Sequence, residues 1–305
     1  MIRFAALFGL VLCLGLTAGC NLLRVGYPQL DMFAEWTANE YFDLGPHQKD
    51  EFRARFARLH AWHRYEQLPD YAGFLDAAAA RIQKGLTQED ALWIANGAEE
   101  RYRVLIRRSA DDAAAMLMTI TPAQLEALQQ KWKKENARFA REHRIGRTPE
   151  EQHRARVERE LKRIEEWVGR LTPDQEKKVA VLLRDVPIAP KLRYEDRVRR
   201  QREFLALMGE RRDSREFASR LRHFLLNWEE GRDPEYQRVF ASWKPKQAGF
   251  YREVIGLLTP EQRETLLRRL QRYSTDFVQL AQRDGSGTGS SQQRGCPGCP
   301  RAESR

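Results

Sequence analysis

One short pattern recurs along this chain of 305 residues, and it is a pattern that starts α-helices. A Leu or Ile is followed by Thr, Pro, any residue and Gln, at 120–124, 171–175 and 258–262, and Gly replaces Thr at 44–48. Thr at the N-cap accepts a hydrogen bond from the third helical amide, and Pro fits the first helical position because it lacks an N–H. Gln at the third position reaches back to the amide of the cap. The predicted helix caps are Thr121 with Gln124, Thr172 with Gln175, and Thr259 with Gln262.

Between these starts, apolar residues recur at spacings of three and four, which is the repeat of one face of an α-helix. Few segments have the alternation of a strand, so the sequence predicts an all-α fold, an elongated bundle of many helices. Two prolines exclude a helix over 186–190, and Pro245 is expected to kink or split its helix. The expected helices are 28–43, 46–66, 69–84, 88–118 with a break allowed at Gly97, 121–143, 149–170, 172–185, 191–209, 214–230, 234–256 and 259–282.

The motifs also suggest how the chain is divided. The copies at 120 and 258 align onward without a gap, so that Leu128 matches Leu266 and Phe139 matches Phe277. We therefore expect two similar halves from an internal duplication, although capping motifs can also recur by convergence. The predicted division is a signal peptide at 1–19, an anchor and first helix at 20–43, one half at 44–143, a connecting helix at 144–170, the second half at 171–282 and a tail at 283–305.

The first twenty residues predict export and lipidation. Arg3 precedes an apolar run at 4–16, which is followed by the small residues of Thr17-Ala18-Gly19-Cys20. This order is typical of a secretory signal, and a cysteine directly after the cut resembles a lipobox, in which the sulfur carries diacylglycerol. The alternative is a plain secretory signal in which Cys20 is an ordinary thiol. Asn21 in place of Asp favours the periplasmic face of the outer membrane, in a Gram-negative bacterium.

The charge balance limits the classes of partner. The chain carries a formal charge of +10, and loss of Arg3 with the signal leaves +9. A basic exported protein can associate with a membrane, through its anchor and anionic lipid, and with acidic clients such as unfolded or envelope proteins. Nucleic acid is excluded as a partner by the predicted location, and the sequence does not predict an oligomeric state.

Two cysteines remain for the mature tail, Cys296 and Cys299. They lie in a Gly, Ser and Pro segment that we expect to be disordered, because it offers almost no apolar residues to bury. A small disulfide loop between Cys296 and Cys299 is the first expectation in an oxidising compartment, and metal capture or intermolecular pairing are the alternatives.

The sequence predicts no enzyme, no metal site and no cofactor. His60, His63 and Glu66 share one helical face, but nothing marks a further ligand, so helix packing is the expected role. No phosphate loop or nucleophile motif occurs. The densest basic stretch lies at 197–212, where Arg199, Arg200 and Arg202 are candidates to contact lipid headgroups or acidic clients. A plain solvated helix face is the alternative reading of that stretch.

The Leu/Ile-Thr-Pro-x-Gln motifs resemble the LTxxQ motifs of the Spy/CpxP periplasmic stress-protein family. That resemblance implies an ATP-independent chaperone or an envelope-stress modulator, which holds clients on a basic and partly apolar concave surface. The segments 27–36, 41–44 and 62–72 make the whole chain resemble an uncharacterised family of proteobacterial lipoproteins, which implies no chemistry. Two functions therefore stay open, a lipid-anchored periplasmic binding protein and a scaffold lipoprotein that binds one envelope partner. A concave, apolar and basic surface lined from several helices would favour the first.

Overall fold

The structure, a computed structural model, describes residues 22–282, and all elements in that range are helical, which confirms the predicted all-α class. In chain order they are α2 (Leu22–Gly26), the 3₁₀ turn η1 (Tyr27–Gln29), α3 (Leu30–Phe42), α4 (Pro46–Trp62), the π-helical turn η2 (His63–Gln67), α5 (Leu68–Lys84), α6 (Gln88–Met118), α7 (Pro122–Glu142), α8 (Pro149–Val168), α9 (Pro173–Leu182), α10 (Pro190–Gly209), α11 (Ser214–Leu226), α12 (Pro234–Leu257) and α13 (Pro260–Gln282). The signal peptide, Cys20, Cys296 and Cys299 lie outside the described residues.

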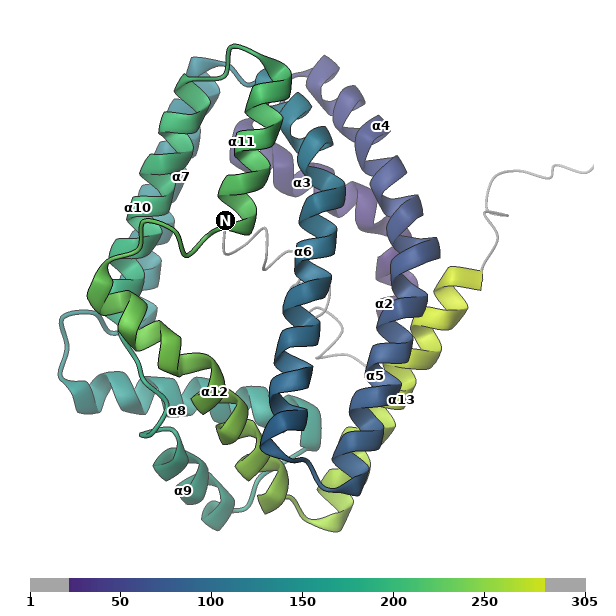
Figure 1. The fold of residues 1–305 in the computed structure, drawn as a ribbon, viewed down its shortest axis with the longest axis vertical. Helices are drawn as coiled ribbons and strands as arrows, with labels where there is room; N and C mark the ends of the chain where they lie inside the picture. Colours follow the sequence, from purple (N-terminus) through teal and green to yellow (C-terminus); the bar gives the residue numbers. More distant parts are fainter. Residues whose placement is uncertain (1–21, 283–305) are drawn as a thin grey trace, which may run out of the picture.

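The helices form an elongated frame (Figure 1). One long side consists of α4 and α5, with α13 packed along α5, and α7 lies beside α10 on the opposite side. The long helix α6 runs between these sides and packs against α11 and α12. Helices α8 and α9 close the lower end. Because α13 contacts α5 and α12 contacts α6, helices of the two predicted halves are interleaved, and the duplication stays a hypothesis.

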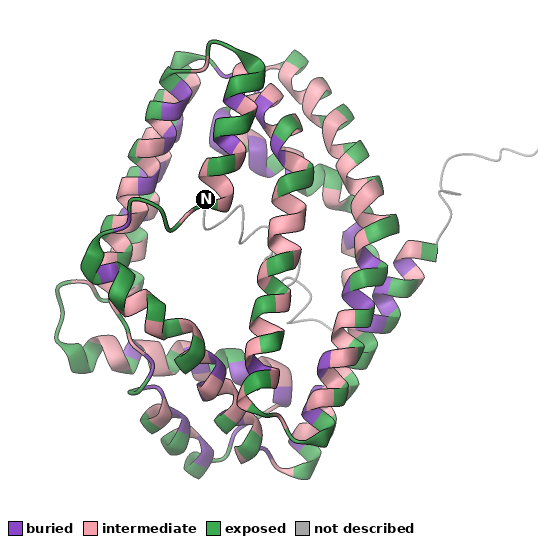
Figure 2. Cartoon of the chain, viewed as in Figure 1, coloured by how far each residue is buried: buried purple, intermediate pink, exposed green. Residues whose placement is uncertain are grey.

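Three apolar clusters hold the described part of the frame: an upper and a lower core, one toward each end of the long axis (Figure 2), and a smaller cluster where η1 packs against α5 and α13. The upper core joins α3, α6, α7, α10 and α11, and the lower core joins α8, α9, α12 and α13 with the end of α5. The apolar residue that precedes each capping motif is buried in one of them. Leu44 and Ile120 belong to the upper core, and Leu171 and Leu258 belong to the lower core. Each motif therefore starts a helix and also fixes the entering chain to a core.

The predicted separation of helices 46–66 and 69–84 is wrong, because α4, η2 and α5 form one continuous helical rod. Pro69 lies in the first turn of α5 and has no N–H to donate to the preceding turn. The π-helical turn His63–Gln67 stands directly before it and changes the hydrogen-bond register there. The helix therefore continues through Pro69.

The structure differs from three other predictions, which concern α6, α11 and α12. Gly97 does not break α6; a Cβ at this position would lie 2.4 Å from Cε2 of Phe74, so glycine allows the close approach of α5. Pro245 does not split α12, which is continuous over Pro234–Leu257. Helix α11 ends at Leu226 rather than near residue 230, because Asn227 leaves helical backbone angles. Trp228 therefore lies in a loop and not in a helix.

Candidate functional site

Each predicted threonine cap has the geometry of a reciprocal capping box. The Oγ1 atoms of Thr121, Thr172 and Thr259 accept hydrogen bonds of 3.2–3.3 Å from the backbone N–H groups of the glutamines three residues later. In return, the Oε1 atom of each glutamine accepts from the threonine N–H at 2.9–3.0 Å. At the copy that begins with Gly45, Oε1 of Gln48 accepts from the Gly45 N–H at 2.9 Å.

The same four glutamines pair across the fold. Nε2 of Gln48 donates to Oε1 of Gln124 at 3.1 Å, and Oε1 of Gln48 accepts from Nε2 of Gln124 at 2.8 Å; we call this pair the first joint. Gln175 and Gln262 form the second joint, with reciprocal bonds of 2.7 and 3.1 Å. The other N–H of each amide donates to the carbonyl of the residue directly before the opposite motif, for example from Gln175 to Leu257 at 2.8 Å. Every donor and acceptor of these side chains is therefore used to hold two helix starts together.

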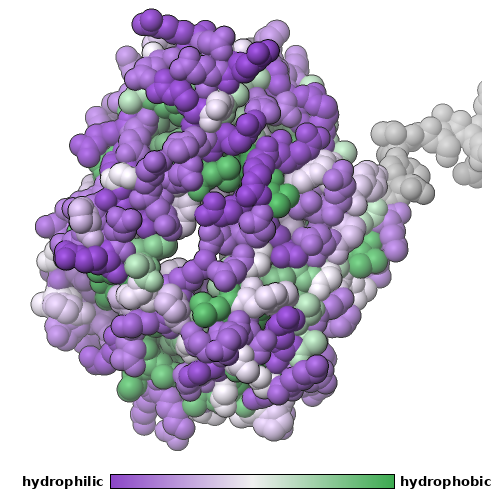
Figure 3. All heavy atoms as spheres, viewed as in Figure 1, coloured by the Kyte–Doolittle hydropathy of each residue, from purple (hydrophilic) through white to green (hydrophobic). Residues whose placement is uncertain are grey.

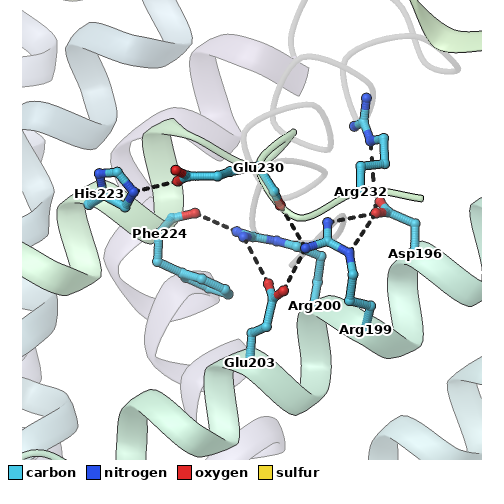
Figure 4. Close-up of polar contacts among 8 residues, drawn as sticks. All are labelled: Asp196, Arg199, Arg200, Glu203, His223, Phe224, Glu230 and Arg232. Atoms are coloured by element: carbon cyan, nitrogen blue, oxygen red, sulfur yellow. Dashed lines mark hydrogen bonds and ion pairs between the residues drawn. The ribbon is translucent and has the colours of Figure 1, made fainter. Parts of the chain in front are cut away.

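Two of the predicted contact arginines, Arg199 and Arg200, lie on α10 and contact acidic side chains (Figure 4). Arg199 pairs with Asp196 at 2.6 Å and with Glu203 at 2.6 Å, and Arg200 is buried, donating to the Phe224 carbonyl and to Glu203. Arg202 is exposed. Arg199 and Arg200 thus have acceptors within the protein, and the prediction that the three contact a client stays a prediction.

A cavity of about 590 Å³ lies between the two cores, and we call it the central cavity. Its walls come from α6, α7, α8, α10 and α12 and from the loops that precede α10 and α12. Hydrophobic atoms gather around the hollowed middle of a face that is otherwise hydrophilic (Figure 3). The volume is that of pockets that hold small molecules or a short segment of chain.

Arginine and aromatic side chains dominate the wall of the central cavity. The arginines are Arg156, Arg159 and Arg163 from α8, Arg193, Arg197 and Arg200 from α10, and Arg232 from the loop before α12. The acidic side chains on the wall are Glu99, Glu160 and Asp196. The aromatic rings are Tyr102, Trp132, Phe204, Trp228, Tyr236, Phe240 and Trp243. The wall is therefore concave, basic and apolar at once.

Part of this positive charge is not neutralised by a carboxylate. Arg156 donates to the carbonyl of Val186 at 2.7 Å, and Arg159 donates to the carbonyl of Glu142 at 2.8 Å. Burial lowers the pKa of both guanidinium groups below the usual value, and for Arg159 the nearby Arg163 lowers it further. The same causes act on His143 at the cavity edge, where burial and then Arg193 and Arg159 lower the pKa to about 4. An anion that entered the cavity would be stabilised by this field.

Arg232 is the most unusual group of the wall. Only 1% of its side chain is exposed, and its Nε, Nη1 and Nη2 atoms have no hydrogen-bond partner among the described residues. The guanidinium carbon lies 4.2 Å from the ring centroid of Phe240 and 4.9 Å from those of Trp228 and Tyr236. Such cation–π contacts contribute about 0.5–2 kcal/mol each. Leaving a buried charge without acceptors costs several kcal/mol in general.

The sequence contained a signal for this wall that local charge density does not reveal. Arg156, Arg159 and Arg163 are spaced by three and four, and so are Arg193, Arg197 and Arg200. That spacing places each set on one helical face. Arg232 lies outside a helix, and no local pattern marks it.

The structure places the remaining chemical candidates away from the central cavity. His63 Nδ1 lies 2.8 Å from the Tyr27 hydroxyl, and the rings of His60 and Tyr27 are in contact, so both histidines pack η1 against α4. Within residues 22–282, no group of three His, Cys, Asp or Glu side chains is arranged to hold a metal ion. In the same range, no helix is both long enough and apolar enough to cross a bilayer.

Comparison with known proteins gives a family and no function. The model of a family of unknown function, DUF6279, matches residues 40–237, which is more than half of the chain. No curated protein and no solved structure matches significantly. The matched range contains the first joint and most of the cavity wall, including Arg193, Arg232 and Tyr236, whereas Gln262 of the second joint lies beyond it.

Proposed function

The chain belongs to DUF6279, a family of unknown function, and from that premise we propose that it is a lipid-anchored binding protein of the cell envelope. In this proposal the central cavity holds an exposed, acidic segment of a client polypeptide without the use of ATP. The protein would act as a chaperone or as a modulator of envelope stress, on the periplasmic face of the outer membrane.

One observation carries the proposal, namely that the central cavity is basic and aromatic and is walled by five helices. Positive charge attracts an acidic client at a distance, and aromatic rings supply contact area at short range. A scaffold that binds one folded partner would instead need a convex surface, and it would gain nothing from a hollow lined with arginine. The cavity therefore favours the binding protein over the scaffold.

The paired capping motifs support the resemblance to the Spy/CpxP family. LTxxQ-like motifs that merely started helices would have no reason to meet, but Gln48 pairs with Gln124 and Gln175 pairs with Gln262. The motifs thus act as structural joints of the frame that surrounds the cavity. This role agrees with the recurrence of the motif in exported helical proteins.

Exposed apolar side chains close to Cys20 support attachment to a membrane. Val25 is 57% exposed, Met32 55%, Phe33 49% and Trp36 63%, and all four lie within sixteen residues of Cys20. Apolar and tryptophan side chains are favoured at a membrane–water interface. Acyl chains on Cys20 would supply most of the membrane affinity, because each buried methylene contributes about 0.8 kcal/mol. The exposed side chains would then lie near the lipid surface.

The proposed client activity is tested by an aggregation assay. We expect the purified protein to slow the aggregation of an unfolded model protein at equimolar amounts, in low salt and without ATP. Added salt should weaken this effect, because salt screens the long-range attraction that brings an acidic client to the cavity. If aggregation is unchanged in low salt, the binding function is wrong and the scaffold function is preferred.

Crosslinking locates the client on the protein. A photoreactive amino acid at Gln247, which lines the cavity, should crosslink to the model client. The same group at Glu253 is the matched control, since Glu253 is exposed on the same helix and does not line the cavity. Equal crosslinking from both positions would place the client outside the cavity.

The anchor is tested separately with Cys20→Ser. This variant should accumulate in the soluble periplasm or as an uncleaved precursor, since no acyl chain can be attached to serine. Mass analysis of the mature wild-type protein provides the direct check, and an unmodified Cys20 would rule out lipidation.

A further inference from the structure

Within the central cavity, two arginines stand out because the described residues offer them no acceptor. The guanidinium of Arg232 has no hydrogen bond to the described residues, and Oδ1 of Asp196 lies 3.8 Å from its Nε. That distance is too long for a hydrogen bond. Asp196 is already engaged by Arg199, through bonds of 2.6 and 3.0 Å. The guanidinium of Arg232 therefore keeps unused donors inside the protein.

Arg193 is the second of these arginines. It lies in the first turn of α10, lines the cavity and is exposed to it, and its guanidinium carbon is 5.7 Å from the centroid of the Phe139 ring. Its guanidinium group forms no hydrogen bond and no ion pair with any of the described residues. Burial lowers the pKa of its guanidinium; Tyr236 opposes this effect, and the charges of Arg163 and Arg197 lower the pKa further.

Tyr236 connects the two arginines. Its side chain is buried in the first turn of α12, and the centroid of its ring lies 4.9 Å from the guanidinium carbon of Arg232. Arg193, Arg232 and Tyr236 thus line one cavity from α10, from a loop and from α12. We propose that these three groups form an oxyanion-binding subsite of the central cavity, which takes a carboxylate or a phosphate group.

The loop before α12 is built to hold Arg232 in this place. Gly231 has φ of +69°, a backbone conformation that favours glycine, and an added Cβ would lie 3.0 Å from Nη1 of Arg199. The same Nη1 donates to the carbonyl of Glu230 at 2.7 Å (Figure 4). Arg199 therefore ties the loop to α10, and it is a positioning residue for Arg232.

The chemistry of the subsite defines the class of ligand. Two guanidinium groups offer planar sets of N–H donors, which match the two oxygens of a carboxylate or the oxygens of a phosphate. Phe240 and Trp243 stack at 5.6 Å between ring centroids, and Trp243 is 36% exposed, so an apolar group next to the anion would find an aromatic surface. The ligand is thus an oxyanion carried by a small organic group or by a short peptide segment.

The inference rests on the same cavity as the proposed function, but its test needs no unfolded client. Tryptophan fluorescence of the purified protein, in low salt, is followed during titration with inorganic phosphate and, separately, with the acetylated and amidated dipeptide Phe-Glu. The neutral dipeptide Phe-Gln is the matched probe. Saturable binding of phosphate alone assigns a phosphate source, and saturable binding of Phe-Glu alone assigns a carboxylate source. Failure of the wild-type protein to bind either anion overturns the subsite.

The variants separate the subsite from the general positive field. Arg232→Met and Arg193→Met should each weaken binding of the anion by about tenfold or more, since each removes charged donors. Tyr236→Phe should weaken it less, because it removes one neutral donor. Arg107→Met is the control, since Arg107 is exposed on α6 and paired with Glu100 at 2.8 Å.

Equal binding by Arg232→Met and wild type would contradict the subsite, and so would an equal loss in Arg107→Met. The folded state of each variant is checked by its thermal transition. Loss of anion binding with intact suppression of aggregation would refute the subsite alone. Anion binding by a protein that leaves aggregation unchanged would refute the polypeptide client alone.

Discussion

The joints and the central cavity use polar side chains in opposite ways. At the second joint, each amide of Gln175 and Gln262 has a partner for both N–H groups, and both side chains are buried. In the cavity, the buried guanidinium of Arg232 has no hydrogen bond among the described residues. Both regions lie inside the same frame and both bury polar atoms, but only the joint satisfies them.

This difference separates polar groups that join two parts of the fold from a polar group that the described residues leave without hydrogen bonds. A buried polar group that makes all its hydrogen bonds holds two elements together, and its removal lowers the free energy of unfolding. A buried charge without acceptors lowers stability, so it persists where another role requires it.

The largest change in stability should come from the second joint. Gln175→Ala removes the partner of the Gln262 amide and leaves the Leu257 carbonyl and the Thr172 N–H without their bonds. Each unsatisfied buried group costs about 1–3 kcal/mol, so we expect a loss of about 3 kcal/mol in the free energy of unfolding, measured by urea denaturation.

Two matched variants sharpen that measurement. Gln48→Ala, at the less buried first joint, should cost less than Gln175→Ala. Gln129→Ala removes only one weak bond to the carbonyl of Leu125, 3.4 Å long, and should change the free energy of unfolding by less than about 0.5 kcal/mol. A Gln175→Ala variant as stable as Gln129→Ala would show that the joint does not hold the fold.

In the cavity, removal of a buried polar group should not lower the free energy of unfolding. Arg232→Met removes a buried charge that has no hydrogen bond and only a 3.8 Å ion-pair contact with Asp196, and it retains an apolar side chain against Phe240 and Trp228. The lost cation–π contacts are in part replaced by contacts between sulfur and the rings. We expect the free energy of unfolding to stay constant or to rise by up to about 2 kcal/mol, in the same urea experiment. A marked fall would mean that Arg232 serves the fold, and the comparison would fail.

The sequence predicts the helix starts well because capping is local. Thr172, Pro173 and Gln175 lie within four residues, and the bonds between Thr172 and Gln175 do not depend on the rest of the fold. The meeting of Gln175 with Gln262 was not predicted, since it joins residues 87 apart. The predicted break between helices 46–66 and 69–84 was also wrong, because a π-helical turn keeps the helix continuous at Pro69, where a proline normally ends it.

The cavity was not predicted because its wall forms only when several helices pack. The sequence shows a dense basic stretch that includes Arg197, Arg199 and Arg200. The density of arginines does not predict which of them forms an ion pair with a carboxylate. Arg199 pairs with Asp196 one turn away, whereas Arg193, on the same helix, has no such partner among the described residues. The role of Arg232 depends on a loop that the periodicity did not separate from the predicted helix 214–230.

A smaller effect is expected at the caps. Thr172→Ala and Thr259→Ala each remove one hydrogen bond to a helix N-terminus, while the amide pair of the joint can remain. Each should lower the free energy of unfolding by about 1 kcal/mol, as is typical for loss of a threonine cap. The urea midpoints of both variants should fall below wild type but above that of Gln175→Ala. If a threonine variant proved as unstable as Gln175→Ala, the caps and not the paired amides would dominate the joints.

The smallest effect is a change in one pKa that reports the field of the cavity. Burial, Arg193 and Arg159 hold the pKa of His143 at about 4, below the ordinary value of about 6.5. Such a histidine contributes stability that is present above pH 6.5 and is lost as the pH falls toward 4, because the unfolded chain takes up the proton first. Arg193→Met removes one positive charge but leaves the burial, so the pKa should rise without reaching 6.5. Titration by NMR measures it, and His63 is the internal control, since its pKa is also about 4 but the causes are burial and His60. A shift of His63 as large as that of His143 would mean that the variant disturbs the whole fold and not the cavity.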